Sequence, residues 1–174
     1  MNFDLNKSIE ILERTPTVIE ALLSGISDDW TMNNEGPETW SPYDVVGHLI
    51  HGEKDNWIAR LEKALAETGD KSFTTFDRFA QFNESKGKSL AELIKEFKEV
   101  RKKNLSILKS KHLQPSDYAK TATHPAFGTV TLQQLLSTWA VHDLSHLNQI
   151  TRVMAKQYKT AVGPWVEYMG ILTR

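Results

Sequence analysis

Residues 131–158 read TLQQLLSTWAVHDLSHLNQITRVMAKQY, and this stretch decides the fold class. Its apolar side chains recur every three or four positions, which is the period of a helix buried along one side. Thr131 followed by Gln134 forms a capping-box pattern at the start of the stretch. The pattern predicts a long helix that runs to about Tyr158 in an all-α protein.

Three more stretches repeat the helical period, at residues 5–23, 41–68 and 89–111. Pro16 lies near the middle of the first, where its missing backbone donor should kink or interrupt the helix. Ser41 and Pro42 suit the cap and the first position of the second helix, and Ser89 with Glu92 gives the third a capping box. Together with residues 131–158, these stretches predict four long helices.

The segments between the helices have different characters. Residues 69–87 contain four phenylalanines among polar residues, so we expect a packed connection, and residues 113–130 form a longer connection with Pro115, Pro125 and Gly128. No run alternates apolar and polar residues long enough to predict a strand. After Gly163 and Pro164, a tail at 165–174 is expected to add a short helical segment. We expect one domain over residues 1–174.

Composition excludes several classes of function. The 174 residues carry a formal net charge of -1 with scattered Lys and Arg, so neither nucleic acid nor an anionic membrane is an expected partner. No stretch approaches the ~20 apolar residues of a membrane span, and residues 1–10 lack the apolar core of a signal peptide. A cytoplasmic protein is predicted. The chain has no cysteine, which leaves histidine as the metal ligand to consider.

His142 and His146 lie four residues apart on the apolar stripe of the last helix, so both should point into the bundle. Two buried imidazoles at this spacing can share a metal ion, as on the helices of zinc proteases. Two ordinary core histidines that bond to hydroxyls or backbone are the alternative. Gln149 shares their face and is a candidate to orient a ligand, or is a buried amide without a role.

A third ligand must come from another helix. Spacing alone does not choose among the four remaining histidines, which are His48, His51, His112 and His124. The last two lie in or beside connections and are expected to be exposed to solvent. His51 competes with His48, because it follows only three residues later on the same helix.

Residues 40–49, WSPYDVVGHL, resemble a family pattern in which Trp-Ser-Pro leads into a helix that carries a metal-binding histidine. The spacing His142-x-x-x-His146-x-x-Gln149 is similar to the second motif of the same family, the DinB-like superfamily. The resemblance spans most of the chain. It implies His48, His142 and His146 as metal ligands, in a four-helix bundle with up-down-down-up topology. His51, where the family usually has no histidine, leaves a four-histidine site or another third ligand open.

Three neutral histidines leave coordination positions open to water or substrate, as in catalytic metal sites. Zn or Ni is the expected divalent ion, with Fe or Mn as further options. The resemblance implies a metal-dependent hydrolase, or a transferase that activates a low-molecular-weight thiol, acting on a small-molecule substrate. Asp55, on the same helical face as His48, is a candidate general base, or an exposed surface aspartate.

The competing class is a non-catalytic metal-binding or stress-response bundle. The sequence shows no clear nucleophile or acid and base pair apart from the metal site, so catalysis does not follow from the ligands alone. Apolar faces left after folding predict a homodimer in either case.

Overall fold

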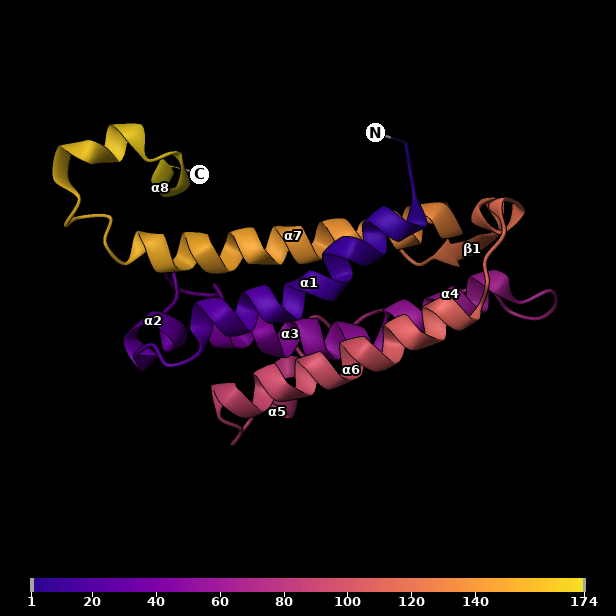
Figure 1. Ribbon diagram of the computed structural model, residues 1–174, viewed down its shortest axis with the longest axis horizontal. Coiled ribbons are helices and arrows are strands. Elements are labelled where there is room, and N and C mark those ends of the chain that lie inside the picture. Colours follow the sequence, from indigo (N-terminus) through magenta and orange to yellow (C-terminus); the bar gives the residue numbers. More distant parts are fainter. Residues whose placement is uncertain (1, 174) are drawn as a thin grey trace.

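The computed structural model describes residues 2–173 and is built on four long helical segments (Figure 1). These are α1 (Leu5–Leu23), α3 (Pro42–Asp55) continued by α4 (Trp57–Leu65), α6 (Leu90–Ser110) and α7 (Leu132–Lys156). Shorter elements connect and extend them: α2 (Asp28–Met32), α5 (Gln81–Glu84), η1 (Pro115–Ala119), β1 (Thr121–His124), β2 (Gly128–Thr131), η2 (Gly163–Tyr168) and α8 (Gly170–Thr173).

Ion pairs and ring contacts give the directions of the helices. Glu13 pairs with Lys109 and Glu20 with Lys98, so α1 and α6 are antiparallel. The Trp57 ring stacks on the Trp139 ring, whereas Trp40, at the other end of the same segment, stacks on His146. The segment α3–α4 is therefore antiparallel to α7.

The two core clusters show how α3–α4 runs relative to α6. Leu49 and Phe97 belong to one cluster, and Leu61 and Leu108, both later in the chain, belong to the other. The two middle segments are therefore parallel, and the long connection between them is required to return the chain to the same end. The up-down-down-up topology is confirmed.

Capping boxes begin three of the helices where the sequence predicted helix starts. Ser89 with Glu92 and Thr131 with Gln134 form both reciprocal hydrogen bonds, and Ser41 caps α3 in the same way. Each box satisfies amide groups that would otherwise lack an acceptor in the first turn.

Of the two predicted outcomes for Pro16, a kink or an interruption, the interruption does not occur, because α1 runs unbroken from Leu5 to Leu23. Its missing N–H leaves the carbonyl of Leu12, four residues earlier, without its helical donor. The Arg101 guanidinium supplies that donor from α6, with Nη1 2.8 Å from the Leu12 oxygen. The helix is continuous because a neighbouring side chain replaces the lost hydrogen bond.

The second predicted helix, 41–68, is divided in two and ends earlier. Asn56 separates α3 from α4 with φ -112° and ψ -68°, away from regular helical values, and α4 ends at Leu65. Asparagine is a poor helix former because its side chain competes for backbone hydrogen bonds. The sequence pattern is periodic on both sides of this residue and did not show the break.

The prediction of no strand was wrong for the connection before α7. Strands β1 and β2 pair as an antiparallel hairpin with Thr121 opposite Thr131 and His124 opposite Gly128. Each strand has four residues, too few to show a sustained alternation. This hairpin forms one wall of a cavity described below.

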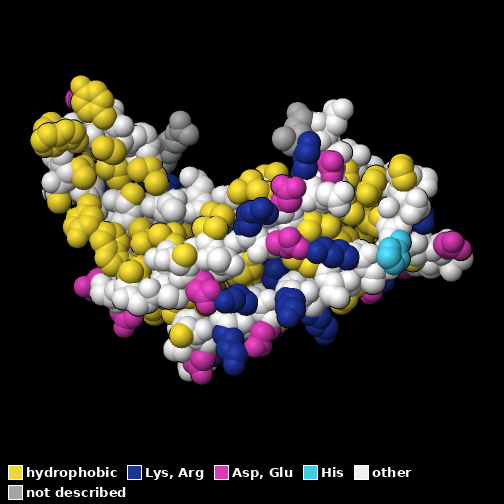
Figure 2. Space-filling view, viewed as in Figure 1, with side chains coloured by type: hydrophobic (Ala, Val, Ile, Leu, Met, Phe, Trp, Pro, Cys, Tyr) yellow, Lys and Arg dark blue, Asp and Glu magenta, His cyan; other side chains and the backbone are white. Residues whose placement is uncertain are grey.

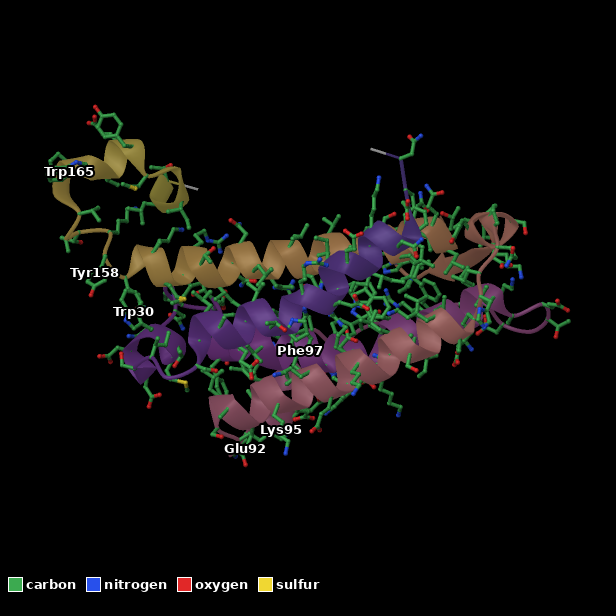
Figure 3. The ribbon with its side chains drawn as sticks, viewed as in Figure 1. Trp30, Glu92, Lys95, Phe97, Tyr158 and Trp165 are labelled. Atoms are coloured by element: carbon green, nitrogen blue, oxygen red, sulfur yellow. The ribbon has the colours of Figure 1, made fainter. Side chains whose placement is uncertain are left out.

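The tail forms an arm beyond the end of α7, where η2 and α8 turn back over that helix (Figure 1). Apolar side chains gather on this arm (Figure 2), including Trp165, which is 64% exposed. Trp30 and Tyr158 meet edge to face at the base of the arm, whereas Phe97 is fully buried inside the bundle (Figure 3). Within residues 2–173, no helix has the length and apolar content needed to cross a membrane.

Candidate metal centre

Three histidine side chains converge between α3 and α7. The Nε2 atom of His142 lies 3.3 Å from that of His48 and 3.1 Å from that of His146. The pair on α7 meets because residues four apart occupy successive turns of one face, and the antiparallel packing of α3 places His48 opposite them. Together the three rings offer nitrogen atoms that lie within 4.8 Å of one another, as donors to one ion must.

Burial keeps these imidazoles neutral. It lowers the pKa of His48 to about 3 and that of His142 to about 2, and the neighbouring histidines lower both values further. Burial also lowers the pKa of His146, although Gln149 and Asp143 oppose that shift. Neutral imidazoles have a free lone pair on one nitrogen, which is the state that binds metal.

The hydrogen bonds of the three histidines do not satisfy all of their ring nitrogens. The Nδ1 atoms of His48 and His142 are buried without a hydrogen-bond partner among the described residues. His146 Nδ1 lies 2.8 Å from Gln149 Oε1, so the ring donates there and turns the lone pair of its Nε2 toward the other two histidines. Three Nε2 atoms thus face one another at the centre of the cluster.

The spacing of these nitrogens matches a shared metal ion. Two imidazole nitrogens ~2.0–2.1 Å from a zinc-sized ion lie ~3.3 Å apart at the tetrahedral angle and ~2.9 Å apart at a right angle. The two printed separations, 3.3 and 3.1 Å, fall in this range. The donor set and its geometry therefore fit one divalent ion.

Two cavities meet at the histidines, and His48 lines both. We call the first the arginine cavity; it has a volume of about 330 Å³ and is lined by Glu38, Thr39, Trp40, His48, Arg78, His146, Gln149 and Arg152. We call the second the aromatic cavity; it has a volume of about 300 Å³ and is lined by His48, Asn56, Trp57, Arg60, Phe73, Phe76, His124, Phe127, Val130, Gln134, Leu135, Thr138 and His142.

The structure does not bring His51 or Asp55 to the three histidines. His51 Nδ1 lies 3.0 Å from Glu84 Oε1 and 3.3 Å from Asp55 Oδ2, in a separate cluster that could also hold an ion. His51 is buried, whereas the Asp55 side chain is 60% exposed and lines neither cavity. Carboxylates that face the His51 ring account for its orientation.

The other two histidines lie apart as well. His112 is exposed just beyond α6. His124 lies on the hairpin, where its Nδ1 accepts a hydrogen bond from the Ala126 amide and its ring stacks on Phe127. It reaches the wall of the aromatic cavity but not the Nε2 cluster.

Next to the histidines lies a buried ionic network that the sequence reading missed. Arg101 pairs through both Nη atoms with Asp143, at 2.6 and 3.0 Å, and through Nη2 with Glu53 at 2.9 Å. Asn104 and Trp139 donate to the remaining positions on Glu53. A signal was available, because Arg101 and Asn104 continue the buried stripe of α6 at helical spacing.

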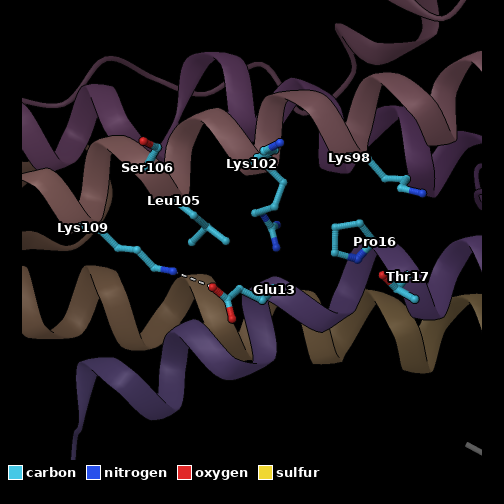
Figure 4. Close-up of a pocket in the computed structure, with 9 residues that line it drawn as sticks. Glu13, Pro16, Thr17, Lys98, Lys102, Leu105, Ser106 and Lys109 are labelled. Atoms are coloured by element: carbon cyan, nitrogen blue, oxygen red, sulfur yellow. Dashed lines mark hydrogen bonds and ion pairs between the residues drawn. The ribbon is translucent and has the colours of Figure 1, made fainter.

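A further cavity of about 440 Å³ lies between α1 and α6, away from the histidines (Figure 4). Ion pairs occupy its rim: Lys109 contacts Glu13, as the dashed line in Figure 4 marks, and Lys98 contacts Glu20. These pairs account for Glu13, Lys98 and Lys109, so most of the charged groups on its rim are paired without a ligand.

Comparison with known proteins agrees with the fold. A solved structure, YfiT from Bacillus subtilis, described as a probable metal-dependent hydrolase with an unusual four-helix bundle topology, superposes with a TM-score of 0.73 at 20% identity. The alignment covers 88% of this chain and 86% of that one. No curated protein matches the chain. The family model of the DinB superfamily matches residues 11–150, and the chain therefore belongs to that superfamily.

Proposed function

We propose that this protein is a metal-dependent hydrolase of a small-molecule substrate, with one divalent ion held by His48, His142 and His146. The observation that carries the proposal is the convergence of three neutral imidazoles, one buried and two half-buried, beside two cavities. Three protein ligands leave a position for water or substrate, which distinguishes catalytic from structural zinc sites. YfiT, a neighbour of the same fold, is described as a probable metal-dependent hydrolase.

The side chains of this chain prepare the site in two ways. Gln149 accepts from His146 Nδ1 and keeps the opposite nitrogen free to bind an ion. Trp40 packs on His48 and Trp57 packs edge-on against His142, so that two indole rings hold the imidazoles and keep bulk water from them. A divalent ion bound there would lower the pKa of a water molecule and polarise the bond to be hydrolysed.

A thiol transferase is the second candidate, and it uses the same three histidines. It differs in requiring a low-molecular-weight thiol as a second substrate, whose sulfur would bind the metal as a thiolate. A non-catalytic metal-binding bundle is the third. A homodimer is proposed for each, to be measured by analytical ultracentrifugation.

The test begins with elemental analysis of protein purified without a histidine tag. We expect about one Zn, Ni, Fe or Mn per chain, lost in His48→Ala and His142→Ala and retained in His112→Asn, which alters an exposed histidine outside the site. Reconstituted protein is then assayed on esters, amides and lactones, with and without added thiols. Hydrolysis that depends on the metal and on His142 supports the proposed hydrolase. Turnover that occurs only with an added thiol favours the thiol transferase, and bound metal without turnover favours the non-catalytic bundle.

A further inference from the structure

The arginine cavity contains a guanidinium group that no carboxylate neutralises. Arg78 forms no ion pair or hydrogen bond within residues 2–173; it lies over the rings of Trp40 and Phe79, at 5.7 and 5.2 Å from their centroids. The other arginine of this cavity, Arg152, is engaged at 2.6 Å by Glu35. Arg78 is therefore the group available to a ligand.

The position of Arg78 relates it to the metal centre. The Trp40 ring that supports Arg78 also packs on His48, with ring centroids 4.7 Å apart, and stacks on His146 at 6.4 Å. One indole ring thus separates the guanidinium from two of the three histidines. An anion held by Arg78 would lie close to the histidines without displacing any of them.

The charged groups of the arginine cavity favour one class of anionic ligand. Its charged groups are Arg78, Arg152 and Glu38, and Arg152 is already paired. One free guanidinium beside a carboxylate suits a monoanion better than a doubly charged phosphate, which Glu38 would repel. The planar fork of arginine matches the two oxygens of a carboxylate.

The aromatic cavity, on the other side of His48, suits an apolar group. Phe73, Phe76 and Phe127 line it, and the Phe76 ring lies 5.7 Å from that of His48. Its one arginine, Arg60, is already engaged, because the guanidinium lies over the Phe73 ring and donates to the Thr74 carbonyl. Aromatic walls of this kind bind hydrocarbon by removing it from water.

We propose that the substrate is a carboxylate-bearing small molecule with an apolar group, bound by Arg78 at one end and by the aromatic cavity at the other, with its reacting bond at the three histidines. This rests on the proposed function and names the substrate class of that site. Arg78 is thereby the residue that selects for the anion.

Binding rather than turnover tests the inference, so that an inactive protein remains informative. Calorimetric titration of the metal-loaded full chain compares 4-phenylbutanoate with its neutral isostere 4-phenylbutanamide. We expect the acid to bind about tenfold more tightly, as for a partly exposed charge-assisted pair. Arg78→Gln should remove this preference, whereas Lys102→Gln, which loses the same charge away from both cavities, should keep it. Equal binding of acid and amide, no binding of either, or a preference that persists in Arg78→Gln overturns the proposal.

A second series tests the apolar end. Lengthening an unbranched carboxylate from butanoate to octanoate should tighten binding about twofold to fourfold per methylene. Phe127→Ala should flatten this gain, and Tyr168→Ala, which truncates an exposed ring on the tail, should not. A gain that is the same in Phe127→Ala and wild type would place the apolar group elsewhere. Failure of ester hydrolysis with these binding results intact would count against the hydrolase alone.

Discussion

Two buried polar clusters lie side by side between α3 and α7, and they differ in how completely they are hydrogen-bonded. In the ionic network, all four carboxylate oxygens of Glu53 and Asp143 accept from Arg101, Asn104 or Trp139. In the histidine cluster, two buried Nδ1 atoms have no partner and three Nε2 atoms face one another. The first cluster leaves only the Arg101 Nε atom without a partner among the described residues, whereas the second leaves nitrogen atoms of all three rings free to bind a further component.

The two clusters also differ in whether their buried nitrogen groups carry a charge. Burial disfavours the charge of Arg101, yet Glu53 and Asp143 raise its pKa above the usual value, so the guanidinium stays charged. Burial raises the pKa of Glu53, and its bonds to Arg101 and Asn104 oppose that shift. Burial lowers the pKa of His48 and His142, and no carboxylate among the described residues compensates. Buried charge is therefore retained where it is paired and removed where it is not.

The largest expected effect on stability comes from disrupting the ionic network around Arg101. Arg101→Met leaves two buried carboxylates and the Leu12 carbonyl without their donor, so the free energy of unfolding should fall by about 3–5 kcal/mol. Urea denaturation followed by circular dichroism measures the change. Lys102→Met, the same substitution at the exposed neighbour, should change stability by less than about 0.5 kcal/mol. Equal stability of the two variants would show that the network does not hold the bundle together.

Metal binding to the histidine cluster should have the next largest effect on stability. A divalent ion at a hundredfold excess over its Kd should stabilise the chelator-treated protein by about 2.7 kcal/mol. Thermal denaturation with and without Zn or Ni measures this, and His142→Ala should lose the response while keeping its helical circular dichroism. A metal response that survives in His142→Ala would point to the separate cluster of His51, Asp55 and Glu84.

The pH dependence of the metal-free protein sharpens the comparison. His48 and His142 have folded-state pKa values of about 3 and about 2, below the ~6.5 of an unfolded chain. The unfolded state therefore binds more protons below pH 6.5, and stability contributed by each neutral histidine is lost as pH falls. Between pH 6 and pH 4 we expect a loss of about 2 kcal/mol per histidine. His142→Gln should lose about 2 kcal/mol less than wild type over the same interval, and parallel curves would contradict the assignment.

The smallest expected effect comes from removing the side chain that orients the His146 ring in the histidine cluster. Gln149→Leu removes the acceptor for His146 Nδ1 and should weaken metal affinity about tenfold, with little change in the stability of the metal-free protein. Competition with a fluorescent chelator measures the affinity. Asn148→Leu, at the exposed position before it, is the control, and equal affinities of the two variants would mean that Gln149 does not orient the ring.

The helices were predictable because their cause is local. Apolar periodicity and capping boxes located α6 and α7 to within a few residues, and the spacing of His142 and His146 predicted their shared face. His48 could be chosen over His51 only through the family resemblance, because both lie near the middle of one helix. The choice between them depends on Glu84, which is 33 residues from His51 in sequence and pairs with it only in the folded chain.

The ionic network was not predicted for a similar reason. Arg101 continues the apolar stripe of α6, but Glu53 and Asp143 look like surface charges when each helix is read separately, because charged residues are seldom fully buried without a partner. Their partners come from different helices, so pairing appears only after packing. The break at Asn56 and the hairpin before α7 also depend on neighbours that periodicity does not include.

The Arg101 guanidinium reaches every long helical segment of the bundle: it lies on α6 and bonds to Leu12 of α1, Glu53 of α3 and Asp143 of α7. No helix can therefore leave the bundle without exposing a buried ion pair or carbonyl. Local opening should cost nearly as much as complete unfolding, so the backbone amides around these four residues should exchange with deuterium at a common, slow rate. The chain should thus unfold as a single cooperative unit, and the histidine cluster beside this residue should be rigid in the metal-free protein.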